Sequence, residues 1–298
     1  MALKGSKPLL ADKRLKMFVF GPAGVGKTTA AIMFPQTYII DCEKGTENYT
    51  SSIIKSKSVV FKSNNPDEIK QELKSLLTEK HEFKTVLLDP ITQIYNAIQE
   101  KWTRIFEKHA KTEKEAEVQD FGMRYWAKVK GDYKSIIRML LSLDMNVICT
   151  SHQKDIYGNG MTKIGVGPDS MRGDDYAFDL VFQLENINGK RMAKTIKERS
   201  EIGKNKFPES FEWSYANFSK FYGAEVLQRD SVPVLLASPD QVSEIKRLLD
   251  VVKIDSEEIN KWFTKADVDS FDEMTSDQIS KCIDYVSKKL EVKKEVTK

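Results

Sequence analysis

The chain contains 298 residues, of which 40% are hydrophobic and 31% charged, and its formal net charge is +3. This length is enough for one large α/β domain with a small appendage, or for two modest domains. The longest apolar runs are far shorter than the ~20 residues that span a bilayer, and the N-terminus lacks the apolar centre of a secretion signal. We therefore expect a cytoplasmic protein that makes no membrane contact.

The cysteines and the charges exclude some further classes. Cys42, Cys149 and Cys282 lie too far apart for a metal-ligand set, and they indicate no disulfide framework. Residues 188–206 carry seven Lys or Arg against two Glu, whereas residues 239–290 carry eight basic and twelve acidic residues. The middle of the chain is therefore basic and its end is acidic.

The segment GPAGVGKTT matches the pattern of a phosphate-binding loop. The apolar run Met17–Phe20 precedes it and the helix-compatible run Thr28–Phe34 follows it, which is the strand-to-helix context that such a loop needs. Glycines there let backbone N–H groups surround a triphosphate at a helix N-terminus. The alternative is a Gly-rich turn that matches by accident. The candidate nucleotide-binding residues are Gly21, Pro22, Ala23, Gly24, Val25, Gly26, Lys27, Thr28 and Thr29.

Two residues of this loop and one acid beyond it have more specific expected roles. Lys27 would reach the β and γ phosphates of ATP, and the Thr28 hydroxyl would hold Mg²⁺. The run Phe83–Asp89 is predicted to be a buried strand that ends in an acid, which is the form of a Walker B segment. Asp89 would accept a hydrogen bond from Thr28 or from magnesium-bound water. The alternative is that Asp89 caps the next helix.

Strands and helices alternate along the first half of the chain, and this alternation predicts a parallel sheet with ligands at the carboxyl ends of its strands. After the loop, the predicted strands are Thr37–Asp41, Ser58–Phe61, Phe83–Asp89 and Met145–Thr150, and the predicted helices are Asp67–Leu77, Thr92–His109 and Phe121–Leu143.

Three aromatic residues of the last two helices, Trp102, Tyr125 and Trp126, lie among ten basic residues between positions 101 and 138. Aromatic and basic side chains together bind nucleic acid in some proteins. At helical spacing, however, aromatic residues more often pack a core beneath a solvated face. We favour the core interpretation.

A histidine and a long loop follow the strand Met145–Thr150. His152 is one of only three histidines in the chain, and it stands at the strand end beside the expected nucleotide. The glycine-rich segment from Gln153 to Asp175 is predicted to be a loop, and it is too long to serve only as a connector. Next, Phe178–Leu184 and Arg191–Lys197 alternate around Asn188-Gly189, which predicts a β-hairpin. A further strand is expected within residues 207–213.

The chain divides into five expected segments. A basic arm at 1–16 precedes an ATPase core at 17–223, a linker at 224–238, a helical module at 239–290 and a tail at 291–298. The module should contain three helices, at Pro239–Val252, Ser256–Phe263 and Ser276–Leu290.

The order of these elements resembles that of the RecA family of recombination ATPases, and especially the short phage-encoded RecA-like proteins that anneal or pair single strands. The resemblance covers about residues 15–222. It implies an α/β fold: a RecA-like P-loop NTPase core with a mostly parallel central sheet, followed here by a small C-terminal helical module. If the protein is phage-encoded, its compartment is the host cytoplasm.

The resemblance also implies catalytic roles. In the family, a glutamate just beyond the strand after the phosphate-loop helix activates the attacking water, and Glu43 in IIDCEKG holds that place. Asp89 is followed by Pro90 and so lacks the adjacent acid that many other ATPases use. The alternative for Glu43 is a surface acid in a turn. His152 stands where the family has its γ-phosphate sensor, with Gln153 as a rival.

DNA and interface contacts follow from the same resemblance. The loop 153–172 resembles the second DNA loop of recombinases, with Lys154, Lys163 and Arg172 as phosphate contacts. Lys197 and Arg199 resemble the paired finger residues that reach a neighbouring subunit's nucleotide, and strand alternation places both on one face. The alternative for this pair is a basic strand that faces DNA or solvent.

Together these features predict an ATP- and Mg²⁺-dependent ATPase that binds single-stranded DNA and promotes annealing or recombination. It would assemble into a ring or filament with ATP at subunit interfaces. The acidic module 239–290 would take a protein partner, such as a single-strand binding protein. Two alternatives remain open: a replication motor or helicase-loader ATPase, and a regulatory nucleotide switch that does not bind DNA.

Overall fold

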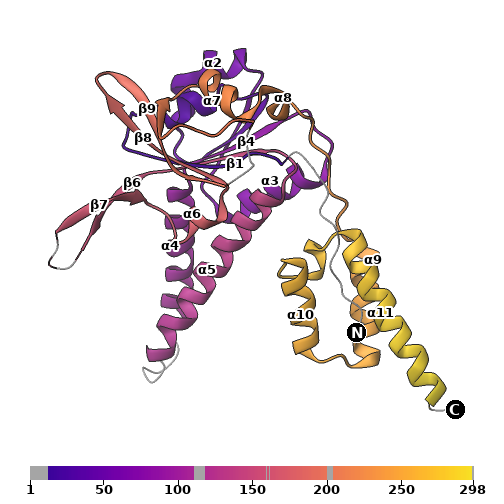
Figure 1. The fold of residues 1–298 in the computed structure, drawn as a ribbon. Coiled ribbons are helices and arrows are strands. Elements are labelled where there is room, and N and C mark those ends of the chain that lie inside the picture. The colour runs from indigo at the N-terminus through magenta and orange to yellow at the C-terminus, as the bar shows by residue number, and fades with distance from the viewer. Residues whose placement is uncertain (1–12, 111–117, 159, 161, 200–203, 297–298) are drawn as a thin grey trace.

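The computed structural model describes residues 13–110, 118–158, 160, 162–199 and 204–296. Its centre is an eight-stranded sheet with the strand order β10-β9-β8-β1-β5-β4-β2-β3, shown in Figure 1. The strands of this sheet are β1 (Lys16–Phe20), β2 (Thr37–Asp41), β3 (Val59–Lys62), β4 (Thr85–Asp89), β5 (Asn146–Ser151), β8 (Leu180–Ile187), β9 (Lys190–Glu198) and β10 (Ser210–Glu212).

The sheet is mostly parallel. Every pair from β8 through β1, β5, β4 and β2 to β3 is parallel, and only β9 and β10 join antiparallel at one edge. Strand β5 lies between β1 and β4, so it separates the strand before the phosphate loop from the strand that ends in Asp89. The predicted α/β fold, with a mostly parallel central sheet and helices at the C-terminus, is confirmed.

Helices cover both faces of the sheet. Because its central strands are buried on both faces, their sequences are continuous apolar runs. On β1, Phe18 and Phe20 pack with α3, α4 and α5, whereas Met17 and Val19 pack toward α1 and α7. The helices of this part are α1 (Lys27–Ala31), α2 (Thr50–Lys55), α3 (Pro66–Thr78), α4 (Ile91–Ala110), α5 (Val118–Ser142), α6 (Asp174–Ala177), α7 (Tyr215–Tyr222) and α8 (Ala224–Leu227).

The aromatic residues of α4 and α5 mainly support the core. Trp102 and Tyr125 are partly buried against the cluster beneath these helices. The Trp102 indole N–H donates to Asp132 at 2.8 Å. Trp126 is more exposed, at 43%. The charged stretch that joins the two helices lies mostly outside the described residues.

The predicted loop from Gln153 to Asp175 is partly wrong. It contains an antiparallel hairpin of β6 (Gln153–Tyr157) and β7 (Lys163–Pro168), which projects from the body of the molecule in Figure 1. Glycines lowered the expectation of strand here, but they make room across the hairpin. A β-carbon on Gly158 would lie 2.9 Å from Ile164, and one on Gly167 would lie 2.9 Å from Ile156. The glycines therefore accommodate the two isoleucines.

The hairpin around Asn188-Gly189 is present, because β8 and β9 pair antiparallel on either side of it. Both turn residues have positive φ, 53° for Asn188 and 78° for Gly189, as a two-residue hairpin turn requires. The next strand is shorter than predicted, since β10 covers only Ser210–Glu212. Helices α7 and α8, which the sequence reasoning did not anticipate, bury Phe218, Tyr222 and Leu227 against the sheet.

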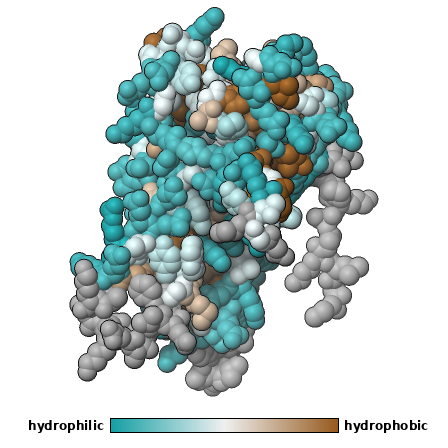
Figure 2. Space-filling view, turned by 90° about the vertical axis from the view of Figure 1, so that its left-hand side faces the viewer, coloured by the Kyte–Doolittle hydropathy of each residue, from teal (hydrophilic) through white to brown (hydrophobic). Residues whose placement is uncertain are grey.

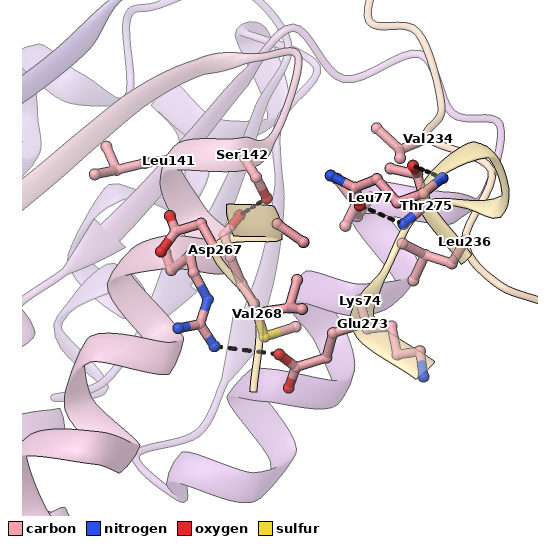
Figure 3. Close-up of a pocket in the computed structure, with 14 residues that line it drawn as sticks. Lys74, Leu77, Leu141, Ser142, Val234, Leu236, Asp267, Val268, Glu273 and Thr275 are labelled. Atoms are coloured by element: carbon pink, nitrogen blue, oxygen red, sulfur yellow. Dashed lines mark hydrogen bonds and ion pairs between the residues drawn. The ribbon is translucent and has the colours of Figure 1, made fainter. Parts of the chain in front are cut away.

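The C-terminal part contains three helices around its own apolar cluster. Helix α9 (Pro239–Val252) begins with a capping box between Ser238 and Gln241. The others are α10 (Ser256–Ala266) and α11 (Ser276–Val296). Between these helices and the core lies a pocket of about 440 Å³, lined from α3, α5, residues 234–236 and the C-terminal part, and drawn in Figure 3.

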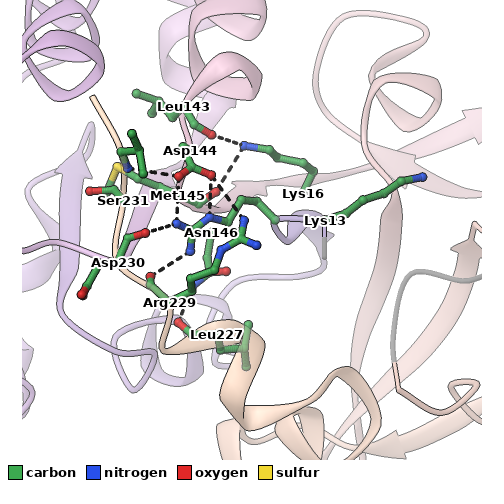
Figure 4. A network of polar contacts seen from close by, with 12 residues as sticks. Lys13, Lys16, Leu143, Asp144, Met145, Asn146, Leu227, Arg229, Asp230 and Ser231 are labelled. Carbon is green, nitrogen blue, oxygen red and sulfur yellow. Dashed lines mark hydrogen bonds and ion pairs between the residues drawn. The ribbon is translucent and has the colours of Figure 1, made fainter. Parts of the chain in front are cut away.

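Residues at both ends of the core meet at Asp144, as Figure 4 shows. Arg14 donates to both carboxylate oxygens of Asp144, at 2.8 and 3.0 Å, and also to the carbonyl oxygens of Arg229 and Asp230. The Val232 N–H donates to Asp144 at 3.0 Å. The first part of the predicted linker is therefore attached to the core. Residues 1–12 of the predicted arm lie outside the described residues.

Among the described residues, no helix is both long and apolar enough to span a bilayer.

Candidate nucleotide-binding site

The carboxyl ends of four neighbouring parallel strands bring the predicted site residues together. The phosphate loop follows β1, Glu43 follows β2, Asp89 ends β4 and His152 follows β5. The register aligns these ends, because Asp41 pairs with Asp89 and Phe20 pairs with Ser151. The crevice outside the carboxyl ends of such strands is where open α/β sheets bind ligands.

The phosphate loop adopts the backbone conformation that its glycines permit. Gly24 and Gly26 have φ of 72° and 92°, in the left-handed region that L side chains rarely occupy. Lys27 Nζ donates to the carbonyl oxygens of Gly21 at 2.8 Å and Pro22 at 2.9 Å. Burial lowers the pKa of Lys27, and the charges of Asp89 and Glu43 oppose this effect. The ammonium group is thus held at the loop itself.

Thr28 and Asp89 are in direct contact. The Thr28 hydroxyl donates to Asp89 Oδ2 at 2.5 Å, and the Thr150 hydroxyl donates to Asp89 Oδ1. Burial raises the pKa of Asp89, while these hydrogen bonds and the charge of Lys27 oppose the rise. The sequence reasoning missed Thr150, because its contact with Asp89 depends on β5 lying beside β4.

A hydroxyl and a carboxylate oxygen at this place fit Mg²⁺, which prefers oxygen ligands and usually takes one or two from protein, with the rest from phosphates and water. Among the described residues, no group of three or more His, Cys, Asp or Glu is arranged to hold a metal ion by itself. Thr28 and Asp89 would therefore hold the ion together with bound nucleotide.

Asp41 shapes the turn that carries Glu43. Its carboxylate accepts hydrogen bonds from the backbone N–H groups of Glu43, Gly45 and Thr46 and from the Thr46 hydroxyl, at 2.6 to 3.1 Å. Burial alone would raise the pKa of Asp41, but the hydrogen bonds from Thr46, Glu43 and Gly45 lower it overall. An Asp whose side chain accepts hydrogen bonds from the backbone N–H groups just after it is a common turn motif. An Asp at the end of a predicted strand was the sequence signal from which this role of Asp41 could have been predicted.

Glu43 contacts two polar side chains. Its Oε1 lies 2.7 Å from Nε2 of His152 and accepts a hydrogen bond from Nε2 of Gln93 at 2.8 Å. The backbone N–H of His152 donates to the Thr92 hydroxyl at 3.0 Å, and this hydroxyl in turn donates to the Asp169 carbonyl oxygen at 2.7 Å. The sequence reasoning missed both Gln93 and Thr92. Gln153, the rival of His152, instead lies in β6 opposite Pro168.

Lys197 and Arg199 lie on one face, as the strand alternation indicates. Lys197 Nζ donates to the carbonyl oxygens of Asp175 and Phe178, at 2.6 and 2.8 Å. Arg199 pairs with Asp179 at 3.0 Å, and both cations reach the Tyr176 carbonyl oxygen. Among the described residues, neither side chain bonds to the phosphate loop, Glu43 or Asp89 of the same chain.

The three candidate DNA contacts lie on the β6–β7 hairpin and just after it. Lys154 pairs with Asp169 at 3.3 Å, and Lys163 pairs with Asp155 at 2.8 Å. Arg172 is exposed, and its side chain has no hydrogen-bond or ion-pair partner within the described part of the chain. Figure 2 shows the face of the molecule that carries this hairpin; it is mainly hydrophilic, with its larger apolar groups in the upper half.

A mostly parallel sheet with a phosphate loop after β1 and an acid at the end of β4 is the arrangement of a P-loop nucleotide-binding domain. The sequence model of the AAA domain family matches residues 13–207, which is more than half of the chain. The chain therefore belongs to the AAA domain family.

Many solved structures match this chain, and the following is one of them. The crystal structure of the RadB recombinase is 16% identical, with a TM-score of 0.37, over 66% of this chain and 86% of that one. Among curated proteins, none matches this sequence.

Proposed function

We propose that the chain binds and hydrolyses ATP with Mg²⁺, binds single-stranded DNA and promotes annealing or recombination as an oligomer. The observation that carries the proposal is the grouping at one sheet edge of the phosphate loop, the Thr28–Asp89 contact and the Glu43–His152 contact. Phosphoryl transfer needs positioning and charge stabilisation more than covalent chemistry, and these residues supply both.

Each residue has a separate role in this proposal. The backbone of residues 21–29 and Lys27 bind the phosphates, and Thr28 with Asp89 hold the ion. When bound, Mg²⁺ neutralises developing charge on the phosphate oxygens. Glu43 orients the attacking water and accepts its proton, which a carboxylate within hydrogen-bond reach can do. His152 donates to the γ phosphate.

DNA binding is assigned to the β6–β7 hairpin. Arg172 is exposed and Tyr157 is 60% exposed, so a guanidinium and an aromatic ring are accessible on this side. Lys163 and Asp155 form an exposed pair, with side chains 54% and 40% accessible. Exposed pairs of this kind contribute little to stability, so a DNA phosphate would replace Asp155 at little cost. The expected binding weakens with salt.

Assembly is assigned to Lys197 and Arg199, which would meet the nucleotide of a neighbouring copy. Lys27→Ala and Arg199→Ala should each be nearly inactive alone. Mixed together, they should recover part of the wild-type turnover, because some interfaces then combine an intact phosphate loop with an intact Arg199. If assembled Arg199→Ala hydrolyses ATP as fast as wild type, Arg199 does not act on the nucleotide of a neighbouring copy.

The whole proposal is tested by measuring mass in solution with and without ATP and a single-stranded oligonucleotide. We expect a larger species when both are present, and Lys27→Ala should abolish the effect of ATP. Lys246→Ala, which removes an exposed charge from α9, is the control and should behave as wild type. If ATP changes neither mass nor DNA affinity, the proposal is wrong.

A further inference from the structure

The side chain of Arg191 lies directly over the phosphate loop. A β-carbon placed on Gly26 would be 2.7 Å from Arg191 Cδ, 2.8 Å from Nε and 3.1 Å from Cζ. A side chain at position 26 would therefore displace the arginine, and the φ of 92° already favours glycine there. Arg191 comes from β9, more than 160 residues after the loop in sequence.

The strand geometry explains why Arg191 reaches this place. Ala193 is buried in the apolar cluster on the α1 face of the sheet. Since side chains alternate along a strand, Arg191 lies on the same face as Ala193, whereas Lys194 lies on the opposite face. The hairpin of β8 and β9 thus places Arg191 beside Gly26, which precedes the first residue of α1.

Nothing else in the described chain satisfies this guanidinium. Arg191 is exposed, and its side chain has no hydrogen-bond or ion-pair partner among the described residues. On the facing strand β8, Glu185 lies opposite Met192, on the other face of the sheet from Arg191, and accepts a hydrogen bond from Gln183 at 2.8 Å. An arginine offers five donors in a planar fork that suits phosphate oxygens.

We propose that Arg191 binds the phosphates of the nucleotide held by residues 21–29 of the same chain. This inference rests on the proposed function and adds a nucleotide-positioning residue to it. Lys27 and Thr28 approach the phosphates from α1, and Arg191 approaches from β9 across Gly26. The nucleotide would therefore also tie the β8–β9 hairpin to the phosphate loop.

The test is calorimetric titration of the full chain with ADP and Mg²⁺, which measures binding without turnover. Arg191→Ala should weaken ADP binding about tenfold, as loss of a charge-assisted hydrogen bond does. Arg191→Lys keeps the charge but not the fork, so its loss should be smaller. The matched control is Lys194→Ala, which removes an equal charge from the same strand on the opposite face and should bind as wild type.

The outcomes separate this inference from the proposed function. If Arg191→Ala binds ADP as tightly as wild type, or loses no more than Lys194→Ala, while Lys27→Ala loses binding, the Arg191 assignment is wrong and nucleotide binding stands. If wild type binds no ADP, both are wrong. A thermal melt will show whether Arg191→Ala is folded. If it is not, the ADP affinity of Arg191→Lys is compared with that of Lys194→Ala, and an equal affinity would mean that the Arg191 assignment is wrong.

Discussion

Nε2 of His152 lies 2.7 Å from Oε1 of Glu43. This contact joins the residues that follow β5 and β2, although β4 lies between these strands in the sheet. Gln93 donates to the same oxygen, and among the described residues no hydrogen bond uses Oε2. One carboxylate oxygen is thus anchored, while the other remains available to accept a proton from water.

Glu43→Gln should therefore abolish ATP turnover without abolishing nucleotide binding. The amide keeps the size of the side chain but cannot accept a proton, and removal of a general base lowers rates by about 100-fold or more. Steady-state hydrolysis and ADP titration measure the two effects separately. Glu47→Gln is the control, because Glu47 is an exposed acid close by that pairs with Lys62. Intact turnover in Glu43→Gln would place the base elsewhere.

The phosphate loop was predictable because its pattern is contiguous and lies between a buried strand and a helix. The strand ends at Asp41, Asp89 and Ser151 followed from apolar runs to within one residue. Contacts between strands were not predictable in this way. Thr150 reaches Asp89 only because β5 is inserted between β1 and β4, and a single sequence does not state the strand order.

Arg191 illustrates the same limit over a longer range. The Asn188-Gly189 turn predicted its hairpin, but only the parallel pairing of β8 with β1 brings that hairpin to the phosphate loop. The β6–β7 hairpin was not predicted, and the reason is local. Its glycines obscured the strand pattern, although two of them serve to admit isoleucine side chains across the pair.

Asp174 should make stability depend on pH. Burial raises the pKa of its carboxyl to about 6 from 3.8, although hydrogen bonds from Tyr133 and Ser170 oppose the rise. The folded state therefore favours the protonated acid. This contribution is fully present below about pH 4 and is lost as the pH rises through about 6. The shift corresponds to about 3 kcal/mol.

Asp174→Asn should remove this dependence, because an amide stays neutral and still offers an oxygen to the Tyr133 hydroxyl. Urea unfolding of both proteins from pH 4 to pH 7 provides the measurement. The variant should gain stability relative to wild type as the pH rises. Asp175→Asn, at the neighbouring half-buried acid, is the matched control. A difference that does not change with pH would contradict the prediction.

Arg14 should be important for stability despite its place at the edge of the predicted arm. Its side chain is 5% exposed and bonds to both oxygens of Asp144 and to two carbonyl oxygens of residues 229–230. Arg14→Met would leave these partly buried groups without their donor, at a cost of about 2 kcal/mol. Denaturant unfolding of wild type and Arg14→Met measures this loss of stability. Lys13→Met, an adjacent exposed cation, should change stability little.

Arg14→Lys tests whether the fork or the charge matters. A lysine is a point charge on a flexible stem and cannot reproduce bidentate geometry. It should recover only part of the loss. Full recovery would mean that charge alone holds residues 229–230 to the core.

Arg138 should hold the C-terminal helices against the core. It comes from α5, lines the pocket drawn in Figure 3, and pairs with Asp269 at 2.5 Å and Glu273 at 3.1 Å. Elsewhere in the lining of the same pocket, the Val234 N–H donates to the Leu77 carbonyl oxygen at 2.8 Å. Arg138→Ala should let this contact open more often, so the Val234 amide should exchange hydrogen roughly threefold to fivefold faster, since partly exposed pairs contribute about 1 kcal/mol.

Arg247→Ala is the matched control, because Arg247 pairs with Glu244 within α9 and does not bridge to the core. It should leave Val234 exchange unchanged. High salt should accelerate exchange in wild type and have less effect in Arg138→Ala, because salt screens exposed charges. Equal exchange in wild type and Arg138→Ala would mean that apolar packing around Leu77 and Val234, and not the ion pairs, keeps the C-terminal helices in place.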